Sequence, residues 1–160
     1  MGRTLVAGFG NAYRRDDGVA WAVVNALREQ RGRPPLGLLD DGFDDLGHAV
    51  DTVVLHQLVP ELAETLAGYE LVIFVDAHTG NLPEPVREEW LEPAFRLPFV
   101  SHQTHPATLL DLAQRLHGHA PRALLLSICG HDFDFGEGLS PETAALVPRA
   151  VERILTLVGR

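Results

Sequence analysis

The stretch Leu71-Val72-Ile73-Phe74-Val75-Asp76 is a run of apolar residues, rich in β-branched side chains, that stops at a carboxylate. A uniformly apolar run of this length is typical of a central parallel strand that is covered on both faces. Two further runs are mostly apolar and also predict buried strands, Arg3–Ala7 near the start of the chain and Ala123–Ile128 near its end. We therefore predict a mostly parallel sheet with residues 71–75 at its centre.

Helical patterns alternate with these strands. Val19, Val23 and Leu27 recur at helical spacing, which predicts a helix from about Asp16 to Gln30. Alternating strands and helices predict a three-layer α/β/α sandwich, and the chain length favours a single domain over residues 1–160. The remaining predicted segments are strands at Thr52–Leu55 and Val86–Leu91 (an edge strand), helices at Pro60–Ala67, Pro106–Leu116 and Ser140 to about Val158 (kinked by Pro148), and an irregular stretch at Arg31–Val50.

Composition narrows the class of protein. The chain has 160 residues, with 13 basic and 22 acidic side chains and a formal net charge of −9, which disfavours binding to nucleic acid or to an anionic membrane. No apolar run approaches the roughly 20 residues that span a bilayer, and the opening residues do not resemble a signal peptide. The single cysteine, Cys129, excludes an internal disulfide, so we expect a cytoplasmic protein. Because Cys129 ends a predicted buried strand, we expect an inert core thiol.

The glycine-rich turn Gly8-Phe9-Gly10-Asn11 follows the first predicted strand. It matches only part of a dinucleotide-binding motif, because Tyr13 stands where the third glycine belongs. The next helix opens with Asp16 and Asp17, whose charges would repel a phosphate. The glycines therefore indicate a sharp turn passing close to a bound group, and Asp16 is explained by compensation of the helix dipole. A phosphate- or nucleotide-binding domain remains one alternative.

Three chemically suitable groups occur where ligand sites form in α/β sheets, beyond the carboxyl ends of strands. Asp17 ends the first loop, Asp76 ends the central strand, and His102 precedes a predicted helix. A buried carboxylate is costly unless it is paired or coordinates a cation. Two carboxylates and an imidazole suit a borderline divalent metal. The residues alone leave other roles open: Asp76 as a loop cap and His102 as a structural histidine.

Taken in order, the motifs resemble those of the hydrogenase maturation proteases. These are nickel-dependent endopeptidases that trim the C-terminus of the large subunit of NiFe hydrogenases. The resemblance covers nearly the whole chain. It rests on Gly8–Asn11 with Arg15–Val19, His56–Leu58 with Pro60–Ala63, Leu71–Ala77, Ser101–Gln103, and Gly130 with Gly136–Pro141.

The resemblance implies a fold, a reaction and a site. The fold is an α/β/α sandwich of the phosphorylase/hydrolase-like type with a five-stranded, mostly parallel mixed sheet. The reaction is removal of the C-terminal extension from a large-subunit precursor after nickel insertion. Separately, we expect the protein to be a monomer. Asp17, Asp76 and His102 would be both catalytic and metal-binding, and the nickel would be presented by the substrate, with other divalent metals able to substitute. Substrate-binding residues are then predicted at Gly8, Gly10, Asn11, His56, Gln57 and His105.

Several alternatives stay open. His56 and His105 would equally serve structural roles, or would orient the ligands through hydrogen bonds. The chain lacks the H-E-x-x-H helix of zinc peptidases and the G-x-S-x-G turn of serine hydrolases. A metal-free pair of catalytic aspartates, Asp17 with Asp76, would make the protein an aspartyl protease. A noncatalytic chaperone that docks on the large subunit and shields or delivers nickel is the alternative from another functional class.

Overall fold

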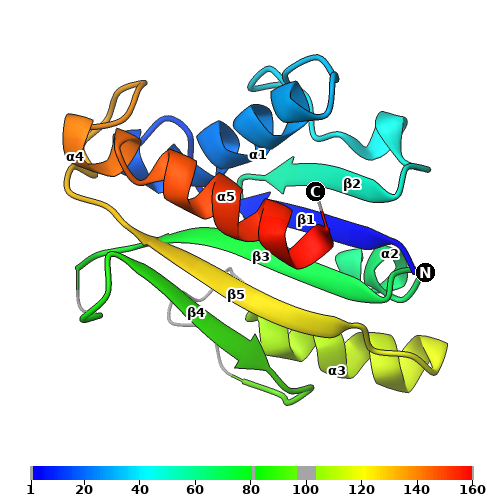
Figure 1. Cartoon of the computed structure of the whole chain (residues 1–160). Coiled ribbons are helices and arrows are strands. Elements are labelled where there is room, and N and C mark those ends of the chain that lie inside the picture. The colour runs from blue at the N-terminus through cyan, green and yellow to red at the C-terminus, as the bar shows by residue number, and fades with distance from the viewer. Residues whose placement is uncertain (1, 81, 97–103, 160) are drawn as a thin grey trace.

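A five-stranded sheet forms the centre of the computed structural model, which describes residues 2–80, 82–96 and 104–159 (Figure 1). The strand order is β2-β1-β3-β5-β4, and all neighbouring strands are parallel except for β4, which runs antiparallel to β5 at one edge. This confirms the predicted mixed, mostly parallel sheet. The strands are β1 (Thr4–Phe9), β2 (Val50–Leu55), β3 (Leu71–His78), β4 (Val86–Leu91) and β5 (Arg122–Cys129).

Helices cover both faces of the sheet, as the predicted sandwich requires. The 3-10 turn η1 (Arg15–Gly18) leads into α1 (Val19–Gln30), which packs with α5 (Val147–Val158) on one face. The short α2 (Leu62–Leu66) and α3 (Pro106–His117) pack on the other. Successive residues of a strand point to opposite faces, so Val6 and Ile73 belong to the first core while Leu5 and Val72 belong to the second.

The termini of two helices differ from the prediction. The first helix begins as a 3-10 turn, and the α-helix starts only at Val19. The closing helix is divided into α4 (Pro141–Ala144) and α5. Pro148 therefore lies in the first turn of α5 and does not kink it, since the backbone N–H that proline lacks would have no helical partner there.

The strands also extend beyond their predicted ends. β3 continues past Asp76 because it stays paired with β5 as far as the pair His78 and Cys129. β2 begins at Val50, earlier than predicted, because Val50 and Asp51 pair with β1. Cys129, predicted to be a core thiol, is half-exposed at the carboxyl end of β5. This contradicts the prediction, because the sheet is no longer covered at that end.

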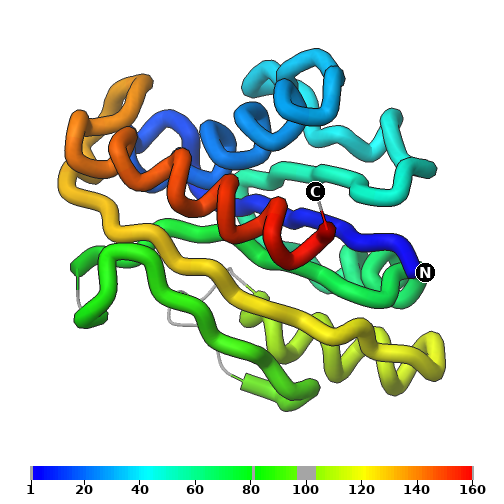
Figure 2. The backbone as a smooth tube through the Cα atoms, in the orientation of Figure 1, coloured from blue at the N-terminus to red at the C-terminus, as the bar shows by residue number. Residues whose placement is uncertain are grey.

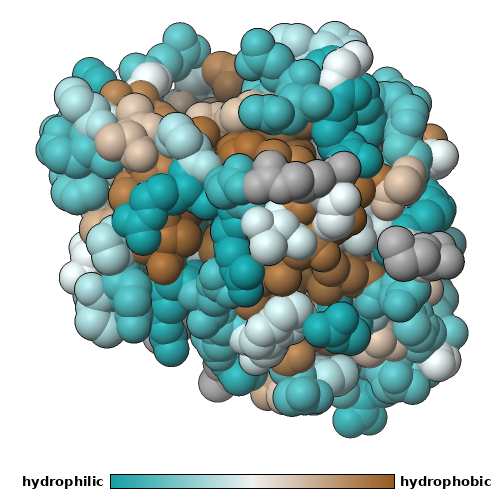
Figure 3. Space-filling model, in the orientation of Figure 1, coloured by the Kyte–Doolittle hydropathy of each residue, from teal (hydrophilic) through white to brown (hydrophobic). Residues whose placement is uncertain are grey.

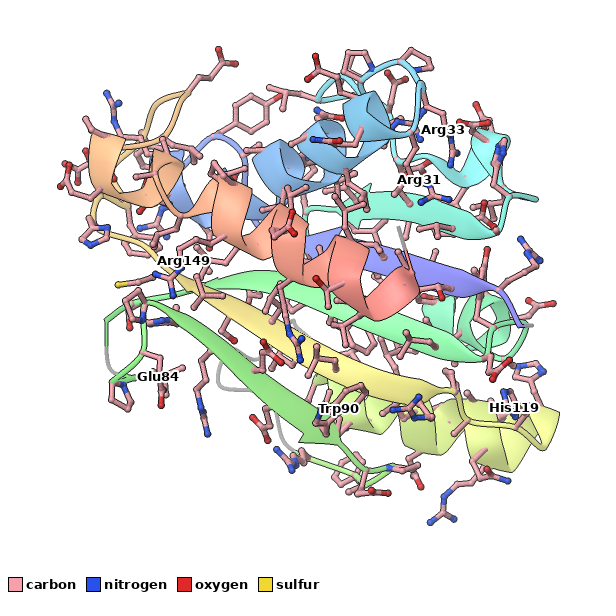
Figure 4. The ribbon with its side chains drawn as sticks, in the orientation of Figure 1. Arg31, Arg33, Glu84, Trp90, His119 and Arg149 are labelled. Carbon is pink, nitrogen blue, oxygen red and sulfur yellow. The ribbon has the colours of Figure 1, made fainter. Side chains whose placement is uncertain are left out.

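The stretch between α1 and β2 is irregular, as predicted, apart from the short 3-10 turn η2 (Phe43–Asp45). It is held by arginines. Arg28, only 2% exposed, donates to the carbonyl of Pro34 and to Thr52 Oγ1. Arg28 and Arg33 both bind the carboxylate of Asp45, and the hydrogen bond from Arg33, which is labelled in Figure 4, contributes most to lowering the pKa of that group.

The surface seen in Figure 3 mixes hydrophilic residues with hydrophobic ones that reach the surface beside α5. Partly buried side chains of this kind include Leu146, Leu157 and Val158. Within the part of the chain that the structure describes, no helix has the length and apolar character needed to cross a membrane.

Candidate functional site

The site forms where β1 and β3 separate. β1 pairs with β3 from Thr4 and Leu71 up to Gly8 and Val75, and then turns away into the first loop. The chain leaves β1 through α1 towards β2 on one side, and it leaves β3 towards β4, α3 and β5 on the other, with α1 and α3 on opposite faces of the sheet. The carboxyl ends of β1 and β3 are therefore a topological switch point, the usual place for a ligand site in such sheets. Asp76 is the first residue of β3 beyond the pairing with β1.

The first loop brings Asp17 back to this point. The backbone amide of Asn11 donates to Asp17 Oδ2 at 2.8 Å, which fixes the carboxylate against the turn. Gly10 has φ +148°, and a Cβ there would lie 2.0 Å from the carbonyl oxygen of Asp17. Gly8 allows α1 to approach β1, since a Cβ there would meet the Cβ of Ala20 at 3.0 Å. These glycines have clear structural roles, and their contact with substrate stays a prediction.

Asp76 lies within electrostatic reach of Asp17. Burial, and after it the negative charge of Asp17, raise the pKa of Asp76 to about 8, while a hydrogen bond from the backbone amide of Ala77 at 2.7 Å lowers it. The segment η1, which carries Asp17, contacts β3 directly. The fold thus brings together two of the three predicted ligands, although their role in binding metal stays a prediction.

The third predicted ligand, His102, lies outside the described residues, as do Ser101 and Gln103. Within residues 2–80, 82–96 and 104–159, no group of three or more His, Cys, Asp or Glu side chains is arranged to hold a metal ion. A three-ligand site on this chain therefore depends on His102.

The other predicted binding residues have distinct surroundings. His56, exposed beyond β2, stacks on Tyr13 with ring centroids 5.8 Å apart and also contacts Trp21. Gln57 is exposed beside it. His105 caps α3, because its Nδ1 accepts from the amide of Ala107 at 3.0 Å. Burial of His105 lowers its pKa, and this favours the neutral ring that can accept this hydrogen bond.

Asp16 has a role that the sequence reasoning missed. It is fully buried, and its carboxylate accepts hydrogen bonds from the backbone and hydroxyl of Ser140, the hydroxyl of Thr143, and the amides of His131 and Asp132. Burial opposes ionisation, but these donors outweigh it and lower the pKa of Asp16 to about 2. Asp16 therefore joins two distant loops, which replaces its predicted role in compensating a helix dipole.

The loop of residues 131–140 lies along the first loop (Figure 2). The amide of Arg15 donates to the carbonyl of Gly136 at 3.0 Å, and the amide of Gly136 donates to the carbonyl of Tyr13 at 2.8 Å. Arg14 Nε donates to the carbonyl of Phe133. The late glycine-rich motif thus supports the loop that carries Asp17. The only sequence signal for this contact was that both motifs contain turn residues and polar groups.

No protein-family model and no curated protein match this chain, but solved structures do. The hydrogenase maturating endopeptidase HybD from E. coli is 24% identical, with a TM-score of 0.74 over 98% of this chain and 91% of that one. A hydrogenase 2 maturation peptidase from a Thaumarchaeota archaeon is 24% identical, with a TM-score of 0.65 over 98% of both chains. HybD from Thermococcus kodakarensis is 21% identical, with a TM-score of 0.64 over 98% of this chain and 99% of that one. This chain therefore has the fold of the hydrogenase maturation endopeptidases.

Proposed function

We propose that this protein is a hydrogenase maturation endopeptidase that removes the C-terminal extension of a NiFe hydrogenase large-subunit precursor after nickel insertion. The observation that carries the proposal is the pair Asp17 and Asp76, which the fold brings together at the switch point between β1 and β3. The fold shared with structures named as hydrogenase maturation endopeptidases supports the same reaction class. We further propose that the protein acts in the cytoplasm as a monomer.

Asp17, Asp76 and His102 are the proposed ligands of the nickel that the precursor presents. The two carboxylates fit a divalent cation, because the cation would offset both the burial of the Asp76 charge and, to a lesser extent, its repulsion by Asp17, the two causes that raise the pKa of Asp76. When bound, the metal would polarise the scissile carbonyl or lower the pKa of a water molecule to about 7. Other divalent metals with a similar preference for oxygen and nitrogen ligands are expected to substitute.

This chain's own residues hold the carboxylates in place. The Asn11 amide fixes Asp17, and the Ala77 amide fixes Asp76. Asp16 anchors the first loop to the loop of residues 131–140, so the loop that carries Asp17 is supported before substrate arrives. Tyr13 and His56 expose a stacked pair of rings beside the same loop, a surface against which a peptide tail would pack.

The direct test is processing of a purified precursor. The nickel-loaded precursor and the same precursor without metal would be incubated with the protein, and the C-terminus of each would be read by mass spectrometry. We expect loss of the extension from the nickel-loaded form alone. Equal cleavage of both forms would favour the metal-free aspartate pair, and metal-dependent complex formation without cleavage would favour the chaperone.

Single substitutions separate catalysis from folding. Asp76→Ala and His102→Ala are expected to abolish processing while circular dichroism shows a folded protein, because each change removes a proposed metal ligand and Asp76 belongs to neither hydrophobic core cluster. Asp44→Ala, on the exposed part of η2, is the matched control and should process normally. If Asp76→Ala unfolds the protein with no separate effect on cleavage, Asp76 is structural.

A further inference from the structure

A cavity of about 300 Å³ opens beside the carboxyl end of β5. Its walls come from the connection between β3 and β4, the end of β5, and α4 with the residue just before α5. Figure 4 shows Glu84 on this connection, at the end of the molecule where α5 begins. The lining residues are Gly80, Leu82, Pro83, Glu84, Pro85, Cys129, His131, Glu142 and Leu146. Among the described residues of this lining, neither Asp17 nor Asp76 is present.

A thiol and an imidazole face each other in this cavity. Cys129 Sγ lies 3.9 Å from His131 Nε2 and 3.7 Å from the carbonyl oxygen of Gly130. Both acceptors are within hydrogen-bond range for sulfur, but only the imidazole nitrogen can take the proton away from the thiol. Cys129 is partly buried and His131 is exposed, so small molecules can reach the pair from the side of His131.

The second ring nitrogen of His131 is held by a buried hydroxyl. His131 Nδ1 lies 2.8 Å from Thr143 Oγ1. That hydroxyl has two acceptors at 2.9 Å, Asp16 Oδ2 and the carbonyl oxygen of Cys129, and its single proton goes to one of them. With that proton on either oxygen, His131 Nδ1 is the donor in its contact with Thr143, which is the tautomer assigned to His131 for this proposal. In the neutral ring this leaves Nε2 unprotonated and directed at the thiol.

We propose that Cys129 and His131 form a thiol–disulfide exchange site for small disulfides. His131 Nε2 takes the proton of the Cys129 thiol, and the resulting thiolate attacks one sulfur of the disulfide. A new S–S bond forms to Cys129 while the disulfide's own S–S bond breaks, and His131 returns the proton to the leaving thiolate. Cys129 is oxidised, and the departing sulfur is reduced, so the product is a mixed disulfide in the cavity.

The charge of the lining indicates which disulfides are accepted. Glu84 and Glu142 place two carboxylates on the walls, and the whole chain carries a net charge of −9. Thiol–disulfide exchange at this site should therefore be faster with a cationic disulfide than with an anionic one of similar size. The ligand class is a small cationic disulfide.

The experiment measures the rate of mixed-disulfide formation on the full chain. Cystamine is the cationic probe and dithiodipropionate the anionic one, and mass spectrometry follows the adduct. Cys129 is the single cysteine, so the adduct has one possible position. His131→Gln removes the base, and His117→Gln, on the exposed end of α3, is the matched control.

We expect His131→Gln to react about tenfold more slowly than the native chain, with the control unchanged and cystamine faster than the anionic probe. Equal rates for the native chain and a folded His131→Gln variant would overturn the proposal. A short unstructured cysteine peptide supplies a reference that needs no variant. A native chain that reacts no faster than this peptide would also overturn the proposal, even if His131→Gln fails to fold.

Discussion

The carboxylate of Asp17 acts electrostatically on that of Asp76, and the two meet only because β1 and β3 are neighbours in the sheet. Burial raises the pKa of Asp76 to about 8, and the charge of Asp17 contributes in the same direction. In the metal-free protein, the charge of Asp17 opposes the ionisation of Asp76. This repulsion is a cost in stability that a bound cation would remove.

A double-mutant cycle measures this repulsion. The variants are Asp17→Asn, Asp76→Asn and both together, unfolded by urea in the presence of a chelator. Well above pH 8, where Asp76 is ionised, each single change removes the same repulsion. The double variant should therefore gain less stability than the sum of the two, by about 1 kcal/mol.

The same cycle with Asp44→Asn in place of Asp17→Asn is the control, and its effects should add because Asp44 is exposed on η2. Additive effects of Asp17 and Asp76 as well would mean that their carboxylates do not interact. In that case the proposed metal site would lose its geometric basis.

Gly10 provides a second test of how the first loop holds Asp17. In Gly10→Ala the new Cβ would lie 2.0 Å from the carbonyl oxygen of Asp17, so the loop must move. Gly32→Ala is the matched control, because Gly32 also has a positive φ but has nothing within 4 Å of the added Cβ. We expect Gly10→Ala to lower the free energy of unfolding by about 2 kcal/mol more than the control does. Equal losses would show that the loop adjusts freely.

Much of the fold follows from patterns within short segments. The apolar runs at β1, β3 and β5 and the helical spacing of Val19, Val23 and Leu27 are local signals, and the structure confirms the elements that they predict. The order of the strands is not local. This order places the carboxyl ends of β1 and β3 side by side, and with them Asp17 and Asp76. The residues alone do not predict that Asp17 and Asp76 lie together, and only the family resemblance favours it.

The missed features involve partners that are distant in the sequence. The sequence predicts helix-dipole compensation for Asp16, because its actual donors lie in residues 131–143 and no local pattern connects them to Asp16. Asp51 fell outside the predicted strand because a charged residue breaks an apolar run, and its partners Arg3 and Tyr69 belong to other parts of the chain. The apolar pattern of β5 predicts a buried strand, but it does not show that the last residue of the strand, Cys129, is partly exposed to solvent.

Asp16→Asn is expected to destabilise the protein by about 3 kcal/mol, since the partners of the buried carboxylate are donors. The amide group of asparagine would place its own N–H groups against one or more of these donors. Urea unfolding of Asp16→Asn and of Asp44→Asn, an exposed aspartate, gives the comparison. A loss no larger than that of the exposed control would mean that the two loops are held together without Asp16.

Asp51 predicts a dependence of stability on acid pH. Burial opposes its ionisation, but hydrogen bonds from the Tyr69 hydroxyl, the amides of Gly47 and His48, and Arg3 outweigh burial, so its folded pKa lies below the ordinary value of 3.8. The stabilisation is therefore fully present above pH 3.8 and is lost as the pH falls through the lower, folded pKa.

Asp51→Asn removes the ionisable group, so the native chain's advantage over this variant in free energy of unfolding should be constant near neutral pH. The advantage should shrink below pH 3.8, because only the native chain must bind a proton there. Tyr69→Phe, which deletes the 2.6 Å hydrogen bond to Asp51 Oδ2, should remove part of the advantage in the same pH range. Urea unfolding over a series of pH values measures both variants. If the difference in free energy of unfolding between Asp51→Asn and the native chain stays unchanged at acid pH, the charge of the Asp51 carboxylate does not stabilise the fold.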